Sequence, residues 1–259
     1  MYTSFQLAQK YIRYYLSAAN GKGHGTHSPF VFDFILIALN KRQGYSRPVK
    51  IEARRQQLLK DSTEIEIEDL GAGSRKGSSK RRRVAKIAAT AVKPIKWSHF
   101  LHRLVAHYRP NTIIELGTSL GISTAYMSAA NSAATIHTIE GSRSIQQIAV
   151  QNFAKLGCSN IQSHVGNFDV QLPALLSNVQ TIDLAYIDGN HRYAPTIAYF
   201  NQLLQKKGDH SIFIFDDIHW SAEMEKAWEE IKKHPSVTVS IDLFFMGLIF
   251  FRPEVKVSQ

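Results

Sequence analysis

The stretch from Ile113 to Gly121 constrains the fold of this chain more than any other part of the sequence. A short apolar run ends at Glu115, and two glycines, Gly117 and Gly121, then lead into a helix-like segment at residues 122–130. A strand, a tight loop and a helix start in this order allow a nucleotide-like ligand to lie against bare backbone. Glycine suits such a loop because a Cβ would hold the ligand away and restrict φ. We therefore predict a ligand-binding loop here.

From this point the chain alternates strands with helices. We predict strands at 112–116, 135–139, 161–165, 182–187, 212–215, 237–243 and 248–251, and helices at 122–130, 144–156, 170–176, 193–206 and 223–234. Such alternation predicts a parallel sheet covered on both faces. The last two strands are too close for a crossover helix and should be antiparallel. The predicted class is α/β: a Rossmann-like, doubly wound, mainly parallel seven-stranded sheet with an antiparallel last strand.

The N-terminal part is predicted to be helical. Helices are expected at 2–19, 30–39, 52–60 and 97–107, the second with Ser28 as its N-cap and Pro29 at its first position. We predict two parts of the chain. Residues 1–96 form a helical region with a basic loop that covers a substrate or contacts another subunit, and residues 97–259 form the ligand-binding domain.

The net charge of +10 is unevenly distributed. No acidic residue occurs between Asp69 and Glu115, and that interval carries Arg75, Lys76, Lys80, Arg81, Arg82, Arg83, Lys86, Lys93, Lys96, Arg103 and Arg109. Such a block attracts nucleic acid, anionic lipid or a phosphorylated substrate, or it is only a solvated face. The sequence leaves these alternatives open.

Two further features of the sequence concern the cellular location of the protein and a second glycine-containing loop. The one cysteine, Cys158, excludes an internal disulfide, and the N-terminus lacks a signal-peptide apolar region, so we expect a cytoplasmic protein without a membrane span. Residues 65–74 also read as a strand entering a glycine turn, at Gly71 to Gly73. A basic, glycine- and serine-rich segment follows it instead of a helix start. We predict a loop that covers a site or binds an anion, with a plain connector as the alternative.

Polar residues follow each predicted strand at the edge where ligands bind in such sheets. Glu140 and Gly141 end the second strand, roughly twenty residues after the first loop, where a carboxylate can accept hydrogen bonds from ribose hydroxyls. Asn167 and Phe168 follow the third strand, where they could read an adenine edge. The fourth and fifth strands end in the segments 188–191 and 216–220, which hold Asp188, His191, Asp216, Asp217 and His219.

Residues from about 97 to 252 resemble the class I S-adenosylmethionine-dependent methyltransferases. The resemblance rests on ELGTSLG at 115–121, IEG at 139–141 and the antiparallel seventh strand. Within that superfamily, AYIDGNH and FDDIHW are similar to small-molecule O-methyltransferases that hold a divalent cation, including those acting on catechols and macrolide sugars. The first 95 or so residues fall outside this resemblance.

The resemblance implies a set of site residues. Contacts to S-adenosylmethionine are expected from Glu115, Gly117, Thr118, Ser119, Gly121, Glu140, Gly141, Asn167, Phe168 and Asp188. Ligands to Mg²⁺ or another divalent cation are expected at Asp188, Asp216 and Asp217. His191 matches the general base of the macrolide-sugar enzymes, and His219 competes for that role.

The chemistry agrees with these residue types. Methyl transfer to oxygen requires alignment of two reactants and removal of a hydroxyl proton, for which histidine is suited near neutral pH. Three converging carboxylates would repel one another unless a cation lay between them, and all-oxygen ligation suits Mg²⁺ or Mn²⁺. In the alternative, Asp188 caps a helix and the aspartates at 216 and 217 orient a loop.

The leading prediction is therefore a metal-assisted O-methyltransferase for a small hydroxylated molecule. An RNA methyltransferase that uses the basic residues 75–109 is one alternative. A binding protein that keeps the fold without catalysis is another. A dehydrogenase is disfavoured because the glycine loop is not Gly-x-Gly-x-x-Gly. The methyl acceptor stays open, and a homodimer is one expected state of the protein.

Overall fold

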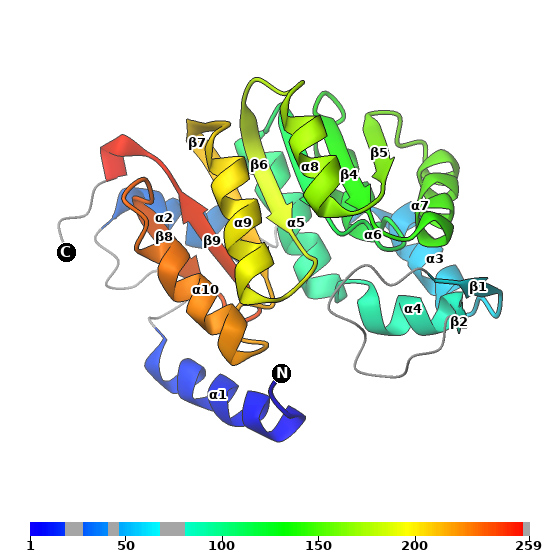
Figure 1. Ribbon diagram of the computed structural model, residues 1–259, viewed down its shortest axis with the longest axis horizontal. Helices are drawn as coiled ribbons and strands as arrows, with labels where there is room; N and C mark the ends of the chain where they lie inside the picture. The colour runs from blue at the N-terminus through cyan, green and yellow to red at the C-terminus, as the bar shows by residue number, and fades with distance from the viewer. Residues whose placement is uncertain (19–27, 41–46, 68–80, 256–259) are drawn as a thin grey trace. The chain divides into compact units, whose positions relative to one another are not determined.

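The computed structural model describes residues 1–18, 28–40, 47–67 and 81–255. Its main feature is a seven-stranded sheet with the strand order β5-β4-β3-β6-β7-β9-β8 (Figure 1). The strands are β3 (Thr112–Leu116), β4 (Thr135–Glu140), β5 (Ile161–Val165), β6 (Ile182–Ile187), β7 (Lys207–Asp216), β8 (Val239–Asp242) and β9 (Met246–Phe250). All seven predicted strands are present, although β7 begins earlier than predicted.

The strand directions agree with the predicted fold class. Strand β4 is parallel to β3 and to β5, and β6 is parallel to β7. Strand β9 lies antiparallel to both β7 and β8. Only three residues, 243–245, separate β8 from β9, so the chain must turn back directly instead of crossing over.

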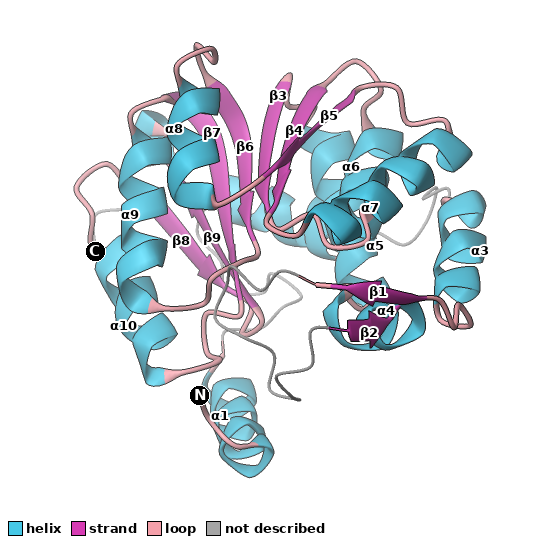
Figure 2. Ribbon diagram, turned by 45° about the vertical axis from the view of Figure 1, so that its right-hand side comes forward, coloured by secondary structure: helices cyan, strands magenta, loops and turns pink. Residues whose placement is uncertain are grey.

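Helices cover both faces of the sheet (Figure 2). They are α6 (Ile122–Ala130), α7 (Arg143–Leu156), α8 (Phe168–Leu176), α9 (Tyr193–Leu204) and α10 (Ala222–Lys232), and a 3₁₀ turn, η2 (Pro253–Val255), follows the last strand. Local signals account for their ends. The Ser221 side chain accepts the Met224 N–H at the start of α10, and Gly157 ends α7 with φ of +73°.

The predicted N-terminal helices are also present. They are α1 (Ser4–Ser17), α2 (Pro29–Asp33), α3 (Val49–Leu58) and α5 (Ile95–Tyr108). The Ser28 side chain caps α2 as expected, but from Phe34 to Leu39 the helix continues as a π-helix, η1. The caps were predictable from sequence, whereas this change in helix type was not.

One N-terminal motif differs from the prediction. Strand β1 (Glu64–Glu66) pairs with β2 (Arg81–Arg83) in a separate antiparallel ribbon, and helix α4 (Val84–Ala91) follows. Neither β2 nor α4 was predicted, because three consecutive arginines show no strand pattern and their pairing partner lies far away in the sequence. The predicted glycine turn at Gly71 to Gly73 lies outside the described residues, as do Arg75, Lys76 and Lys80.

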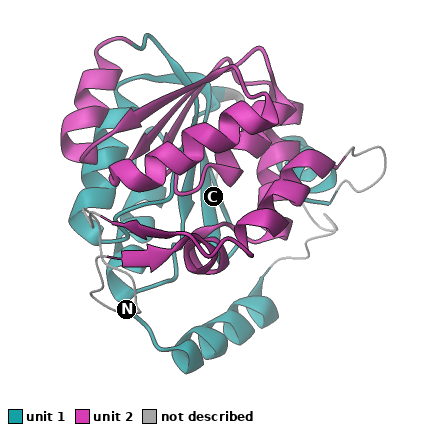
Figure 3. Ribbon diagram, turned by 90° about the vertical axis from the view of Figure 1, so that its right-hand side faces the viewer, with its two compact units in different colours: residues 1–40, 179–259 teal, residues 41–178 magenta. Residues whose placement is uncertain are grey.

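The chain forms two compact units (Figure 3). Unit 1 contains residues 1–40 and 179–259, and unit 2 contains residues 41–178. The N-terminal region is therefore divided, with α1, α2 and η1 in unit 1 and α3 to α5 in unit 2. The predicted functional boundary after residue 96 follows the extent of the motifs, and it stays a prediction.

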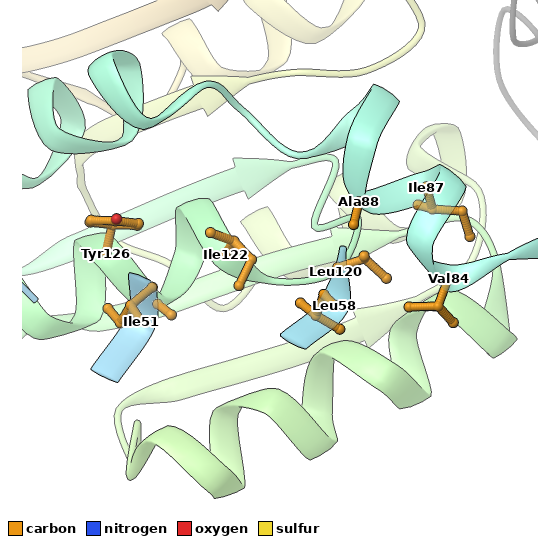
Figure 4. Packing of buried hydrophobic residues seen from close by; sticks show 9 residues of the cluster. Ile51, Leu58, Val84, Ile87, Ala88, Leu120, Ile122 and Tyr126 are labelled. Atoms are coloured by element: carbon orange, nitrogen blue, oxygen red, sulfur yellow. The ribbon is translucent and has the colours of Figure 1, made fainter. Parts of the chain in front are cut away.

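One hydrophobic cluster of unit 2 lies where α3, α4 and α6 meet (Figure 4). Its buried members are Ile51, Leu58, Val84, Ile87, Ala88, Leu120, Ile122, Ala125 and Tyr126. Leu120 and Ile122 flank Gly121, so the glycine loop is anchored on both sides by side chains that water does not reach. This packing holds the loop in one conformation.

A polar network reinforces the same region. Glu52 on α3 accepts hydrogen bonds from Tyr126 on α6 and from His99 on α5, the latter at 2.6 Å. The buried Arg55 donates to the Ser98 hydroxyl at 2.8 Å. Because a buried charge without partners is costly, these bonds specify how α3 packs against α5 and α6.

Candidate active site

The glycine loop after β3 adopts a conformation that depends on its glycines. Gly117 and Gly121 have φ of +105° and +76°, and Ser119 between them also has a positive φ, +47°. A Cβ on Gly121 would lie 2.5 Å from a ring carbon of Phe153. A side chain at position 121 would therefore be strained, and Ser119 occupies a strained conformation that is common at binding sites.

Glu140 connects the three loops of the predicted cofactor site. One carboxylate oxygen accepts the Ser119 N–H at 2.8 Å and the other accepts the Ser142 N–H at 3.0 Å. The Glu140 backbone carbonyl accepts the N–H of Gly166 at 2.9 Å. The glycine loop, the Glu140–Gly141 segment and the loop after β5 thus meet at one residue.

The electrostatics of Glu140 are typical of a binding carboxylate. Burial raises the pKa of this carboxyl, and the backbone N–H groups of Ser142, Ser119 and Gly141 oppose that effect. A carboxylate has about four lone-pair positions, so three backbone donors leave capacity for a ligand hydroxyl group.

Glu115 is placed differently from the prediction of a cofactor contact. Its side chain is completely buried and accepts hydrogen bonds from the hydroxyls of Ser123, Thr124 and Thr138. These partners lie on α6 and β4, so Glu115 ties the strand to the helix that follows the loop. With no exposed surface, the carboxylate supports the loop from behind and any effect on a ligand would be indirect.

The remaining cofactor candidates of unit 2 divide into two kinds. Thr118 is buried, and its hydroxyl lies 2.6 Å from that of Thr138, so it also supports the loop. The Asn167 side chain accepts the Asp169 N–H at 2.8 Å and caps α8, which commits one of its polar groups. Phe168 begins α8 and is half-buried, so its ring keeps some accessible surface.

Ser119 contributes the clearest sign of an incomplete site. Among the residues that the structure describes, its buried Oγ has no hydrogen-bond partner. A buried hydroxyl without a partner costs free energy, so it normally has a functional or solvent-filled explanation. A polar ligand against Gly117 to Gly121 would supply that partner.

In unit 1, the end of β6 brings together Asp188 and His191. The His191 Nε2 atom lies 3.6 Å from Asp188 Oδ1, and the buried Tyr186 donates its hydroxyl to Asp188 Oδ2 at 2.8 Å. Asn190 has φ of +53° and donates to the Tyr199 hydroxyl at 3.1 Å, which shapes the turn between them. The arrangement can orient an imidazole for proton transfer.

His219 is unsuited to the general-base role considered for it. Its Nδ1 lies 3.0 Å from Glu225 Oε1 and its Nε2 lies 2.9 Å from Asp242 Oδ2. Burial alone would lower the pKa of His219, but hydrogen bonds and charges from Asp242 and Glu225 outweigh it and raise that pKa. Because both nitrogens face carboxylates, His219 holds its proton and joins the loop after β7 to α10 and β8.

The predicted metal ligands are not grouped as a metal site. Within the described ranges, no three side chains of the His, Cys, Asp or Glu types are placed to hold an ion. Asp216 is 1% exposed, and Asp217 has φ of +53° with its N–H bonded to the Phe245 carbonyl at 2.8 Å. The Asp188 carboxylate accepts a hydrogen bond from the Tyr186 hydroxyl. As they are placed, these three aspartates do not form a site for the cation.

A cavity of about 320 Å³ lies elsewhere in unit 2. Its lining includes Arg47, Lys50, Ser128 and Cys158, at the start of α3 and the ends of α6 and α7. No predicted site residue lines it. We therefore place the candidate site at the ends of the strands, where the polar residues lie, and not at this cavity.

The sequence missed two residues of these sites. Tyr186 precedes Asp188 by two positions and points to the same side of β6, a spacing that could have suggested the contact. Ser142 supplies a backbone N–H, which no side-chain motif reveals.

No helix in the part of the chain that the structure describes is long and apolar enough to cross a membrane.

Comparisons with known proteins agree with this fold. Residues 114–218 match a family described as methyltransferase domains. The SAH-bound methyltransferase PaMTH1 from Podospora anserina is 12% identical, with 97% of this chain and 98% of that chain covered and a TM-score of 0.62. An O-methyltransferase from Bacillus cereus in complex with SAH is 17% identical, with 80% and 93% covered and a TM-score of 0.58.

A third solved structure is the O-methyltransferase TomG from Streptomyces achromogenes, involved in tomaymycin synthesis and bound to SAM. It is 20% identical, with 62% of this chain and 82% of that chain covered and a TM-score of 0.55. No curated protein matches the chain in sequence. At these identities the likeness to solved structures establishes the fold.

Proposed function

We propose that this chain, a member of the class I S-adenosylmethionine-dependent methyltransferase superfamily, transfers a methyl group to a hydroxyl oxygen of a small molecule. The observation that carries the proposal is the position of Glu140. It joins the glycine loop and the loop after β5 at the end of β4, with carboxylate capacity to spare. The family match over residues 114–218 and the SAM- and SAH-bound structural neighbours support the same cofactor.

The residues of unit 2 fit that cofactor. Glu140 would accept a ribose hydroxyl, and the backbone of Gly117 to Gly121 would lie against the methionine part. The buried Ser119 hydroxyl would gain a polar partner. When bound, S-adenosylmethionine supplies an electrophilic methyl group on a sulfonium centre.

The residues of unit 1 supply the proton chemistry. We assign His191 as the general base. Asp188 faces its Nε2 at 3.6 Å, which leaves Nδ1 to accept the hydroxyl proton. The separation slightly exceeds a hydrogen bond, and catalytic contacts often tighten only when substrate binds. Tyr186 orients Asp188 from within the core.

Cofactor binding is tested by calorimetry with SAH. We expect wild-type protein to bind SAH and Glu140→Gln to lose at least about tenfold in affinity, since an amide accepts fewer hydrogen bonds than a carboxylate. Glu64→Gln is the matched control, because Glu64 lies in the same unit on the exposed face of β1. Equal affinity in Glu140→Gln and wild type would contradict the cofactor assignment.

Methyl transfer is tested with the same proteins on a panel of phenols, catechols and sugars. We expect His191→Gln to lower turnover by about 10²- to 10⁴-fold while SAH affinity stays unchanged. SAH binding without methyl transfer to any acceptor would favour a non-catalytic binding protein. A parallel assay with a chelator tests whether a divalent cation is required. Activity that is lost in chelator and restored by Mg²⁺ would show that the reaction needs a cation, and unchanged activity would show that it does not.

A second candidate function is methylation of RNA. Residues 41–178 hold 20 lysines and arginines against 9 acidic residues, whereas the rest of the chain holds 11 against 12. The positive charge therefore belongs to the unit that carries the candidate cofactor site. A polyanionic acceptor would be drawn to that unit.

A further inference from the structure

Helix α1 attaches to unit 1 through its polar edge. The Tyr2 hydroxyl donates to Glu225 at 2.7 Å, and the Lys10 ammonium donates to both oxygens of the same carboxylate at 3.0 Å. Near the other end of the helix, the Tyr14 hydroxyl donates to the backbone carbonyl of Asp242 at 2.8 Å. Figure 1 shows α1 beside the start of α10, at the periphery of unit 1. The helix is held by hydrogen bonds, and none of its residues is buried.

The apolar stripe of α1 faces away from these contacts. Phe5, Ala8, Ile12, Tyr15 and Leu16 recur at helical spacing on a face opposite to Lys10 and Tyr14. The large members of the stripe are 70%, 58%, 73% and 79% exposed, in chain order. An amphipathic helix normally turns its apolar face toward the protein core. Helix α1 does the reverse.

The exposed apolar surface continues beyond the helix. Tyr11 is 40% exposed and its ring centroid lies 5.7 Å from that of Phe245, which is 42% exposed. Phe245 belongs to the turn between β8 and β9. Contiguous apolar surface of this kind on a globular protein marks a site of interaction.

The charges near the stripe indicate which partner it fits. The first 32 residues contain no acidic residue, and Arg13 flanks the stripe, whereas Lys10 on the opposite face is paired with Glu225. A helix with an apolar stripe, aromatic side chains and basic neighbours binds in the interface of anionic bilayers.

A second copy of the chain complements α1 less well. Two α1 helices paired through their stripes about a twofold axis would each bring Arg13 to the contact and no carboxylate of α1, because Lys10 lies on the other face and is paired with Glu225. We propose that α1 is a membrane-surface element whose outward stripe inserts into the interface of an anionic bilayer. The protein then works at a membrane surface without crossing it.

The test is co-sedimentation of the full chain with vesicles. One set consists of phosphatidylglycerol mixed with phosphatidylcholine, and the other of phosphatidylcholine alone. We expect wild-type protein to bind the mixed vesicles more tightly. The triple substitution Phe5→Ser, Ile12→Ser and Leu16→Ser should reduce binding roughly tenfold or more, because three apolar side chains no longer enter the interface.

Two further variants separate the contributions. Gln9→Ser, an exposed polar residue that borders the stripe without belonging to it, is the matched control and should bind like wild type. Arg13→Glu should weaken binding to the mixed vesicles and leave any binding to phosphatidylcholine unchanged. Circular dichroism of each variant verifies that the fold is retained.

Three results would overturn the proposal. The first is no binding of wild-type protein to either vesicle. The second is equal binding by wild-type protein and the triple variant. The third is a wild-type dimer in analytical ultracentrifugation that the triple variant converts to a monomer, which would assign the stripe to a second copy.

Discussion

At the scale of single residues, the candidate cofactor site depends on backbone conformations that few residues adopt. Gly121 has φ of +76° and faces the ring of Phe153, so it is restricted both by its dihedral angle and by space. Gly157, at the end of α7, has a similar φ of +73°, but among the described residues no heavy atom lies within 4 Å of its ideal Cβ. A comparison of the two positions therefore distinguishes the cost of a left-handed backbone from the cost of a steric clash.

We therefore predict that Gly121→Ala is more destabilising than Gly157→Ala. The left-handed backbone alone costs about 1 kcal/mol for alanine, and the contact with Phe153 adds about 1–3 kcal/mol from overpacking. Urea denaturation of both variants measures the difference. We also expect Gly121→Ala to bind SAH more weakly, because the loop must shift. Equal stability of the two variants would mean that Phe153 moves aside freely.

Glu115 and Glu140, the two acidic residues of the motifs, differ in their surroundings. Both Glu115 and Glu140 follow an apolar run, and the sequence alone predicted a cofactor contact for each. In the structure, Glu115 is enclosed by three hydroxyls from α6 and β4, whereas Glu140 accepts backbone N–H groups at the ends of the loops. The difference arises from neighbours that are far away in the sequence.

At the scale of elements, His219 acts as a connection between segments. Its imidazole lies between Glu225 of α10 and Asp242 of β8 and stacks on Phe244 at a centroid distance of 5.0 Å. The same two residues hold α1, through the Glu225 carboxylate and the Asp242 carbonyl. The charge on His219 thus bears on how firmly α1 is attached.

We predict that the attachment of α1 weakens as pH rises above neutrality. The pKa of His219 is raised in the folded protein, so its contribution is fully present below the ordinary imidazole value of about 6.5 and is lost as pH rises through the folded pKa. The pKa values of Asp242 and Glu225 are lowered, because hydrogen bonds from His219 and other donors outweigh the effect of burial. Their contribution is lost as pH falls through those lowered values.

The measurement is hydrogen exchange of α1 as a function of pH, corrected for the intrinsic rate. Wild-type α1 should be best protected between the carboxyl and imidazole titrations. His219→Gln should show lower protection in that window and little change between neutral and alkaline pH. Protection of wild-type α1 that stays constant up to alkaline pH would contradict the role of the imidazolium.

At the scale of the whole molecule, charge is divided between the two compact units. All of the excess positive charge lies in residues 41–178, and part of it is carried by the β1–β2 ribbon and α4. The Ser144 hydroxyl donates to the Glu66 carbonyl, which ties this ribbon to the segment just after Glu140. The ribbon is therefore attached beside the candidate ribose ligand, within one unit.

If RNA is the acceptor, binding must depend on salt through these charges. We predict that Arg82→Glu, Arg83→Glu and Lys86→Glu together lower the slope of log affinity against log salt by about 2 units, at roughly 0.7 per phosphate contact in single strands. Lys206→Glu with Lys233→Glu, in unit 1, is the matched control. Filter binding of a single-stranded RNA over a salt series gives the slopes. Absence of salt-dependent binding in wild-type protein would remove the RNA alternative.

Much of the fold follows from local sequence patterns. Alternating apolar runs and helical spacing predicted all seven strands of the main sheet and the helices between them. These patterns are readable because a strand or a helix imposes its own period on neighbouring residues. The β1–β2 ribbon and α4 were missed because the arginines of β2 carry no such period and pair with residues nearly twenty positions away.

The candidate site was likewise only partly predictable from the sequence. The sequence by itself determined that polar residues follow each strand and that glycines form the loop from Gly117 to Gly121. Only the tertiary structure decided where these side chains lie: Glu115 is turned into the core, His219 is held between two carboxylates, and the apolar stripe of α1 faces outward. Position along a strand is a local property. The partner of a buried charge, and the direction of a helix face, are set by residues brought together from distant parts of the chain.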